Sequence, residues 1–209
     1  MLIKGGDIVS FFDVYALITL FTFYTLLISK TILQYRNGKQ VIALGKEKTG
    51  FARYLELFFY LGLFFLTYLV VISAFNLSFL GRIELIILFE TLATNILAVL
   101  IQTFAIILFA FALASFKDAW RIGVDYQNAD SLITTGVFKY TRNPTYIAIM
   151  LLFLSYFLLY ANFFFLGSLL FITFAFNHQI KKEETLLKSI FNEEYIKYKK
   201  QTPRYFKIK

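Results

Sequence analysis

Residue types that often carry structure or chemistry are scarce in this chain of 209 residues. It has no cysteine, a single histidine and two prolines. The lack of cysteine excludes a disulfide framework, a thiolate nucleophile and a cysteine-based metal site. One histidine, with no His-x-x-Glu-His pattern, argues against a metal enzyme, and we expect no metal site. No repeat, low-complexity tract or proline-rich linker divides the sequence, so we expect a single domain over residues 1–209.

Charged residues are also few. They make up 16% of the chain, whereas 59% of it is hydrophobic and 20% aromatic. A soluble domain could not bury so much apolar surface, which indicates an all-α integral membrane protein. Four blocks poor in charge are long enough to supply membrane spans, near Val14–Ser29, Leu57–Phe75, Leu85–Ser115 and Asn143–Ile180.

The last of these blocks is too long for one span. It has 38 residues without Lys, Arg, Asp or Glu, which is roughly 57 Å of helix, or two crossings of the bilayer core. Tyr160, Ala161 and Asn162 are the only plausible turn inside it, which predicts a tight hairpin of about Tyr146–Tyr160 and Phe163–Asn177. We therefore predict five transmembrane helices. Residues 1–115 would hold three spans, and residues 116–209 a cytoplasmic loop, the hairpin and a C-terminal helix.

The basic residues favour one orientation of this arrangement. Of the 21 Lys and Arg residues, 19 lie in residues 30–53, 116–142 and 178–209, which five spans place on the same side of the membrane. The positive-inside rule then predicts an N-terminus outside and a C-terminus in the cytoplasm. Topology and attraction to anionic lipids also account for the net charge of +8, so we expect no nucleic-acid partner.

One acidic residue lies inside a predicted span. Glu90, Thr94 or Asn95, and Gln102 recur near helical spacing, with Ala98 between them, and form one stripe. Such a carboxylate often marks a site within the membrane. The alternative is a packing stripe in which Glu90 lies close enough to the outer headgroups to stay hydrated, and this interpretation is favoured.

The loop before the hairpin holds the first candidate ligand-binding groups. Gly136 permits a positive φ and close approach of the backbone to a ligand. Pro144 suits the first position of a helix, and Asn143 before it is a good N-cap. The free N–H groups and positive dipole of that helix end suit an anion, to which Arg142 adds a planar, bidentate donor.

The segment after the hairpin is amphipathic and acidic at its start. Glu183 and Glu184 follow the hairpin exit directly. Apolar side chains near helical spacing would lay this helix on the membrane surface or over the loop: Leu186, Ile190, Tyr195 and Tyr198. Asn192 tolerates the left-handed conformation, so it allows a turn inside the helix.

In order and spacing, the stretch of about Trp120–Phe206 resembles the membrane methyltransferases related to isoprenylcysteine carboxyl methyltransferase and the phospholipid methyltransferases. The elements that carry the resemblance are Trp120-Arg121-Ile122-Gly123, Gly136, Arg142-Asn143-Pro144-Thr145-Tyr146, Glu183-Glu184, Phe191-Asn192-Glu193-Glu194-Tyr195 and Thr202-Pro203-Arg204. The chain departs from the common pattern in having Val137-Phe138 for Pro-Tyr, Asn143 for His, Gln179 for Arg and Asn192 for Gly.

The resemblance implies methyl transfer from S-adenosyl-L-methionine, with S-adenosyl-L-homocysteine as product. It assigns catalytic roles to Arg142, Glu183 and Glu184. It assigns cofactor contacts to Leu132, Thr135, Gly136, Phe138, Tyr140, Arg142, Asn143, Pro144, Tyr146, His178, Glu183 and Glu184. The acceptor would be a lipid-like or prenylated molecule in the membrane, with an isoprenylcysteine-type carboxylate or thiol as the leading candidate. A phospholipid amine is the alternative acceptor, and a non-catalytic membrane protein that retains the fold is another.

Arg142 carries the sharpest expectation. A cation just before a helix N-cap opposes the helix dipole and is unfavourable by about 0.3–1 kcal/mol unless an anion is bound nearby. The sequence therefore predicts that Arg142 clamps a ligand carboxylate. On that hypothesis, Arg142→Ala leaves the stability of the ligand-free protein unchanged or slightly raised.

Overall fold

The regular structure of the chain is helical wherever the structure describes it. This computed structural model describes residues 9–38, 51–77, 86–116 and 131–206, apart from the side chains of residues 51–60. The elements are α1 (Phe11–Arg36), α2 (Phe51–Ala74), α3 (Leu92–Ser115), the short 3-10 helix η3 (Gly136–Lys139), α4 (Pro144–Tyr160) and α5 (Phe163–Gln201). The predicted Trp120–Gly123 element lies outside the described residues.

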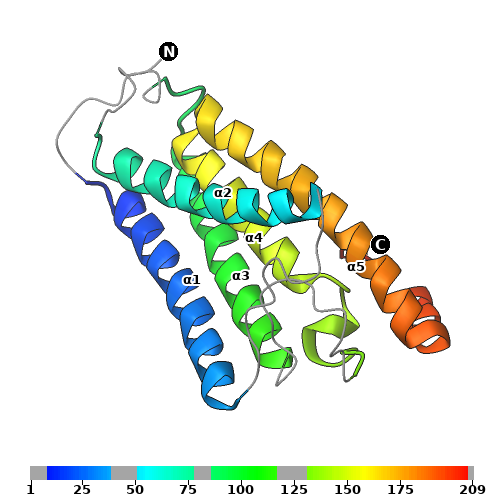
Figure 1. Ribbon diagram of the computed structural model, residues 1–209. Coiled ribbons are helices and arrows are strands. Elements are labelled where there is room, and N and C mark those ends of the chain that lie inside the picture. Colours follow the sequence, from blue (N-terminus) through cyan, green and yellow to red (C-terminus); the bar gives the residue numbers. More distant parts are fainter. Residues whose placement is uncertain (1–8, 39–50, 78–85, 117–130, 207–209) are drawn as a thin grey trace.

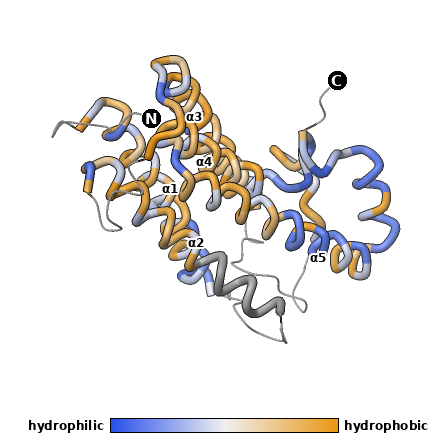
Figure 2. Tube along the Cα trace, turned by 90° about the horizontal axis from the view of Figure 1, so that it is seen from above, coloured by the Kyte–Doolittle hydropathy of each residue, from blue (hydrophilic) through white to orange (hydrophobic). Residues whose placement is uncertain are grey.

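Three of the described helices are long and apolar enough to cross a membrane: α1, α3 and α5. α4 and the Leu61–Ala74 part of α2 are also apolar but shorter. α4 has 17 residues, which is roughly 26 Å of helix, against ~30 Å for the hydrocarbon core. Figure 2 shows apolar residues throughout the bundle, whereas hydrophilic residues gather on the end of α5 that extends beyond it. The chain is thus a helical membrane protein.

Small residues let α3 pack closely in the bundle. Ala98, Ala105 and Ala112 are completely buried and recur every seven residues, so they form one stripe along α3. α3 lies between α1 and α4 and contacts both, while α2 crosses in front of α3 and α4 in Figure 1. Close approach of helix backbones through small side chains is a main source of packing energy where lipid provides no hydrophobic drive.

The polar stripe on α3 points into the bundle, but it is shorter than predicted. Asn95 and Gln102 are buried, and the Thr19 hydroxyl of α1 donates to Gln102 Oε1 at 3.2 Å. Glu90 is not part of the helix. Thr91 is the N-cap of α3, with its side chain accepting from Thr94 N, so the chain turns before α3 and Glu90 precedes it. The expectation that Glu90 lies on the same helical stripe was therefore wrong.

α4 ends and α5 begins at the turn that the sequence indicates. Ala161 adopts a left-handed conformation with a φ of 33°, and Asn162 Oδ1 accepts hydrogen bonds from Phe164 N and Phe165 N. These bonds satisfy two of the free N–H groups at the start of α5. The Ala161 carbonyl in turn accepts from Leu88 N at 2.7 Å, which ties the segment before α3 to the turn.

Candidate active site

A buried carboxylate shared by two arginines is the centre of the polar site. Arg142 Nη2 lies 2.6 Å from Glu184 Oε1, and Arg204 donates to both Glu184 oxygens, from Nη2 at 2.5 Å and from Nε at 3.0 Å. The Arg142 and Glu184 side chains are only 7% and 9% exposed. The three residues come from the segment before α4, the middle of α5 and the chain after α5.

The segment after α5, residues 202–206, runs back across the start of α4, and we call it the C-terminal strap. Arg142 holds it through two atoms: its Nη1 donates to Thr202 O at 2.6 Å, and its backbone N donates to Pro203 O at 3.0 Å. Thr141 Oγ1 donates to Arg204 O at 2.9 Å. The strap is therefore fastened to the α4 entry by both side-chain and backbone bonds.

The partners of Arg142 account for its position without a ligand. The helix dipole disfavours the Arg142 cation by only a small free energy. The hydrogen bonds from its guanidinium to a buried carboxylate and to strap carbonyls outweigh that cost. It is the carboxylate of Glu184 that Arg142 clamps in this structure. The sequence could not indicate this pairing, because the two residues are brought together only by the fold.

Glu184 remains ionised in this environment. Burial by itself raises the pKa of its carboxyl, but hydrogen bonds from Arg204 and Arg142, together with their positive charges, outweigh burial and lower the pKa from 4.5 to about 2. At neutral pH Glu184 is therefore a fixed anion with both oxygens engaged, and it is poorly suited to accept a proton.

Glu183 has a different environment. The Tyr146 hydroxyl donates to Glu183 Oε1, and Gln179 Nε2 approaches the same oxygen at 3.3 Å. The Tyr146 ring also packs edge-on against Phe176 of α5, with the ring centroids 4.7 Å apart. Adjacent glutamates thus face different partners: Glu184 binds arginines, and Glu183 binds a phenol from α4.

Pro144 begins α4, as the sequence predicts, but Asn143 does not cap the helix with its side chain. Asn143 occupies the N-cap position with no side-chain cap hydrogen bond. Its Nδ2 instead donates to Arg204 O at 3.1 Å, the same carbonyl that Thr141 contacts. The strap carbonyl competes for the amide, so the expected cap becomes an attachment point for the strap.

Gly136 has the positive φ that was predicted, 63°, but its close neighbour is a helix of the protein. A Cβ at this position would lie 2.3 Å from Ser115 Oγ at the end of α3, and Val137 N donates to the same oxygen at 3.4 Å. Phe138 is buried, and its carbonyl accepts from Tyr198 OH at 2.7 Å. The loop is therefore held between α3 and the last part of α5.

The other predicted cofactor residues differ in their exposure. Tyr140 is 68% exposed, and Thr135 is exposed at the start of η3. Leu132 is half-buried in the extended segment before η3. His178 is half-buried on α5, on a different face from Glu184 by helical spacing. Hydrogen bonds thus join Arg142 to Glu184, Asn143 to the Arg204 carbonyl, and Tyr146 to Glu183.

No role was predicted for Arg204, which completes the cluster. The signal available was weak: Pro203 marks the end of a helix, and a basic residue follows it. The chain returns to Glu184 only because α5 turns at Asn192, which has non-helical angles of φ 39° and ψ −110°. The expected turn at Asn192 is therefore present. It places Tyr195 and Tyr198 in the buried interior, with Tyr198 against the loop, where its hydroxyl donates to Phe138 O.

Asn192 should be a strained position. A non-glycine residue in such a conformation costs about 1–3 kcal/mol, most of which glycine avoids. We expect Asn192→Gly to raise the free energy of unfolding by about 1 kcal/mol and Asn192→Ala to lower it by a similar amount. Thermal unfolding of the detergent-solubilised protein measures both. Lys188→Gly, at an exposed and helical position of α5, is the matched control and should cost about 1 kcal/mol.

Comparison with known proteins identifies a family that matches part of the chain. No curated protein matches the chain. Residues 91–194 match the family described as phospholipid methyltransferase. The matched range begins just before α3 and includes η3, α4, both glutamates of the site and the turn at Asn192. By this match, the chain belongs to the phospholipid methyltransferase family of membrane proteins.

Proposed function

We propose that the protein transfers a methyl group from S-adenosyl-L-methionine to a lipid-like acceptor at the membrane surface. The observation that carries the proposal is the Tyr146–Glu183 pair beside the buried Arg142–Glu184–Arg204 cluster. Glu184 is held between two arginines, whereas Glu183 accepts from the Tyr146 phenol, and we assign Glu183 to a cationic or hydroxyl-bearing ligand.

The residues around this pair fit the cofactor chemically. The Thr145 hydroxyl and Arg142 Nε are buried, and neither has a hydrogen-bond partner among the described residues. A hydroxyl and a guanidinium N–H beside a carboxylate suit a ligand that carries a carboxylate, an ammonium and ribose hydroxyls. We assign Glu183 and Tyr146 to the ammonium or hydroxyl groups and Arg142 to the carboxylate.

Little more is required of the protein than alignment and exclusion of water. When bound, the cofactor would supply a methyl group on its sulfonium. The acceptor atom would bond to that methyl carbon as the carbon–sulfur bond breaks in line and S-adenosyl-L-homocysteine leaves. The Glu184 cluster positions Arg142 and fixes the strap over the start of α4. Tyr146 orients the Glu183 carboxylate. Because Glu184 is held with a pKa of about 2, Glu183 is the residue we assign to proton acceptance where the acceptor needs deprotonation.

Two acceptor classes remain as proposals. An isoprenylcysteine-type carboxylate is already ionised at neutral pH and needs no base, which suits a site whose acidic groups are hydrogen-bonded. A phospholipid amine needs a base, and the family description favours this second class. The two differ in their dependence on Glu183.

We expect Tyr146→Phe to weaken S-adenosyl-L-methionine binding by about tenfold, because Glu183 loses its oriented donor. Glu183→Gln should lower amine methylation by about 100-fold and carboxylate methylation far less. Calorimetry and transfer of labelled methyl groups to prenylcysteines and phosphatidylethanolamine measure these effects. Glu194→Gln, at an exposed position of the same helix, should leave both unchanged. Unaltered cofactor binding in folded Tyr146→Phe would contradict the site assignment.

We also propose that all five helices cross the membrane, with the N-terminus outside and the C-terminus in the cytoplasm. The proposal is supported by the 19 basic residues that fall on one side of a five-span arrangement. Reporter fusions should give an external signal at Asn162 and a cytoplasmic signal after Arg204. The reverse result at either position would overturn this topology.

A further inference from the structure

The end of α5 beyond the bundle has a positively charged surface. Five of its lysines are exposed: Lys181, Lys188, Lys197, Lys199 and Lys200. None of them forms an ion pair with a described residue. Glu183 and Glu184 of the same helix are held inside the polar site. The other two glutamates of α5, Glu193 and Glu194, are exposed. The exposed charges of this helix end are therefore mostly positive, which suits an anionic partner.

This end of α5 leans away from the other helices. In Figure 1 it extends to the side of the ends of α1 and α3, and in Figure 2 its hydrophilic residues lie beside the bundle. A helix parallel to α1 and α3 would lead straight out of the bilayer. The inclined α5 instead stays close to the surface of the lipid around the bundle, which brings its lysines near the lipid phosphates.

An apolar edge accompanies the lysines. Leu186 and Ile190 lie about one turn apart on the same side of α5. Neither is buried: Ile190 is 38% exposed, and Leu186 is half-buried. A helix with a partly exposed apolar edge and exposed lysines beside it has the composition of a segment that lies in the membrane interface. Lipid is therefore a better neighbour for this edge than water.

The backbone that carries the last lysines is fixed. The Tyr198 hydroxyl donates to Phe138 O at 2.7 Å, and Arg142 Nη1 donates to Lys199 O at 3.3 Å. Because the backbone is already ordered, binding a partner at the lysine side chains costs little backbone entropy. Lys199 also joins this surface to the polar site, since its carbonyl contacts the guanidinium that binds Glu184.

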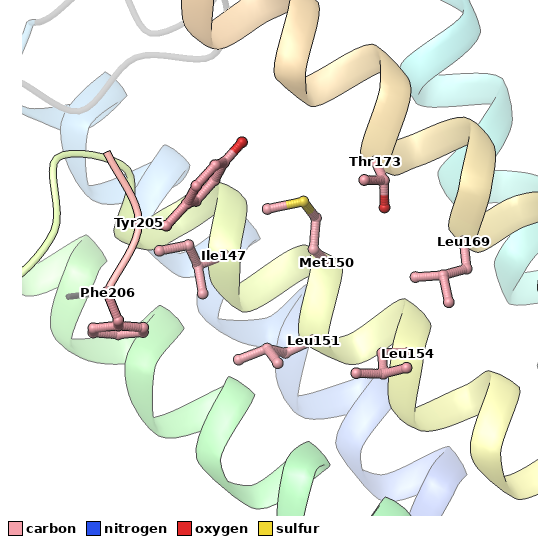
Figure 3. A pocket seen from close by; sticks show the side chains of 8 residues that line it. All are labelled: Ile147, Met150, Leu151, Leu154, Leu169, Thr173, Tyr205 and Phe206. Carbon is pink, nitrogen blue, oxygen red and sulfur yellow. The ribbon is translucent and has the colours of Figure 1, made fainter. Parts of the chain in front are cut away.

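The strap that follows the lysines is held at both ends. Hydrogen bonds to Arg142 fix its beginning. Near its other end, Tyr205 and Phe206 line an apolar groove together with Ile147 of α4 (Figure 3). Lys200 lies two residues before the strap. A partner bound at Lys200 would therefore restrain the strap as well.

We propose that the lysine surface, formed by Lys188, Lys197, Lys199 and Lys200, binds the headgroups of anionic phospholipids and thereby stabilises the strap over the polar site. The lipid phosphates match the lysines in charge, and the acyl chains match the apolar edge at Ile190. A lipid leaflet thus fits this surface better than a soluble anion does. The proposal does not depend on whether the protein transfers methyl groups.

The test places a reporter on the lysine surface. The chain has no cysteine, so Ser189→Cys, at an exposed position between Lys188 and Ile190, takes a single spin label. The labelled protein is reconstituted in vesicles of phosphatidylcholine, with or without phosphatidylglycerol, at low and at high salt. Collisions of the label with a water-soluble nickel chelate then measure how well the bilayer surface shields it.

We expect phosphatidylglycerol to lower the collision rate by about fivefold, which is roughly the contribution of one lysine at an anionic surface. High salt should reverse the change, because it screens the attraction. The triple variant Lys197→Gln, Lys199→Gln and Lys200→Gln should lose most of the response. Arg36→Gln removes an exposed cation at the end of α1, and this control should keep the response.

The unfolding temperature tests the effect on the strap. Phosphatidylglycerol should raise it by about 2–4 °C in the unlabelled wild type and by much less in the triple variant. An equal rise in both proteins would refute the link between the lysine surface and the strap.

Three results of the label experiment would overturn headgroup binding. The first is equal collision rates in the two lipid compositions. The second is an unchanged response in the triple variant, provided that it melts like the wild type in phosphatidylcholine. The third is shielding of the label by heparin, a soluble polyanion, but not by anionic vesicles, which would indicate a different partner. All these measurements are made without S-adenosyl-L-methionine, so failure of the proposed methyl transfer would leave them unaffected.

Discussion

Glu184→Gln is expected to lower the free energy of unfolding by about 3 kcal/mol, since it removes the carboxylate that compensates Arg142 and Arg204. Arg204 can turn toward solvent because its side chain is 33% exposed, but Arg142 at 7% cannot. The variant therefore leaves a buried cation without its counter-charge. Thermal unfolding of the ligand-free protein in detergent measures the loss.

The pH dependence provides an independent check of the same residue. The folded-state pKa of Glu184 is lowered, so its stabilising contribution is present above the ordinary pKa of 4.5 and is lost as the pH falls toward about 2. Wild type should lose stability more steeply than Glu184→Gln in this window. Glu194→Gln, which is exposed, should change the free energy of unfolding by less than about 0.5 kcal/mol. Equal melting of wild type and Glu184→Gln at neutral pH would show that the cluster contributes no net stability.

The parts of the fold that the sequence predicts are those governed by local chemistry. Pro144 at the first position of α4, the positive φ of Gly136 and the turn at Asn192 all follow from the backbone preferences of single residues. The helix break near Ala161 follows from the length of an uncharged block. Each of these features can be predicted without knowing which residues pack against it in the folded chain.

The parts that the sequence does not predict depend on pairs of distant residues. Arg142 and Glu184 are 42 residues apart, and Arg204 reaches the pair only because α5 reverses at Asn192. Asn143 has a good intrinsic capping propensity, yet its amide binds Arg204 O because the strap passes within reach. Local propensity cannot anticipate such competition, since the competing acceptor is supplied by tertiary structure.

The strap also explains how a departure from the common family pattern can be compatible with this site. Where related proteins commonly carry His, Asn143 supplies an N–H donor that holds a strap carbonyl. That role requires a hydrogen bond and no titratable ring. The Tyr205–Asn177 bond fastens the strap at a second point, 28 residues apart in sequence. The imidazole is therefore not required for the contacts that position Arg142 and Glu184.

Arg142→Ala should destabilise the ligand-free protein by about 2–3 kcal/mol, the opposite of what the helix dipole alone predicts. The change removes one partner of Glu184 and leaves Thr202 O without its donor at 2.6 Å. Arg142→Lys should recover part of the loss, because an ammonium can pair with Glu184 but cannot hold the carboxylate and the strap carbonyl in the same fork geometry.

Stability and cofactor affinity, measured together, separate the roles of Arg142. Lys139→Ala removes an exposed cation from the same loop and should leave the unfolding temperature unchanged. If Arg142→Ala melts like the wild type but no longer binds S-adenosyl-L-methionine, the residue serves only the ligand. The other outcome is that Arg142→Ala unfolds at a lower temperature than wild type, while Arg142→Lys keeps most of the stability but loses cofactor affinity. In that case one guanidinium supports both the strap and the ligand. We expect the second result, because Arg142 Nη1 and Nη2 are committed within the protein while its buried Nε has no partner among the described residues.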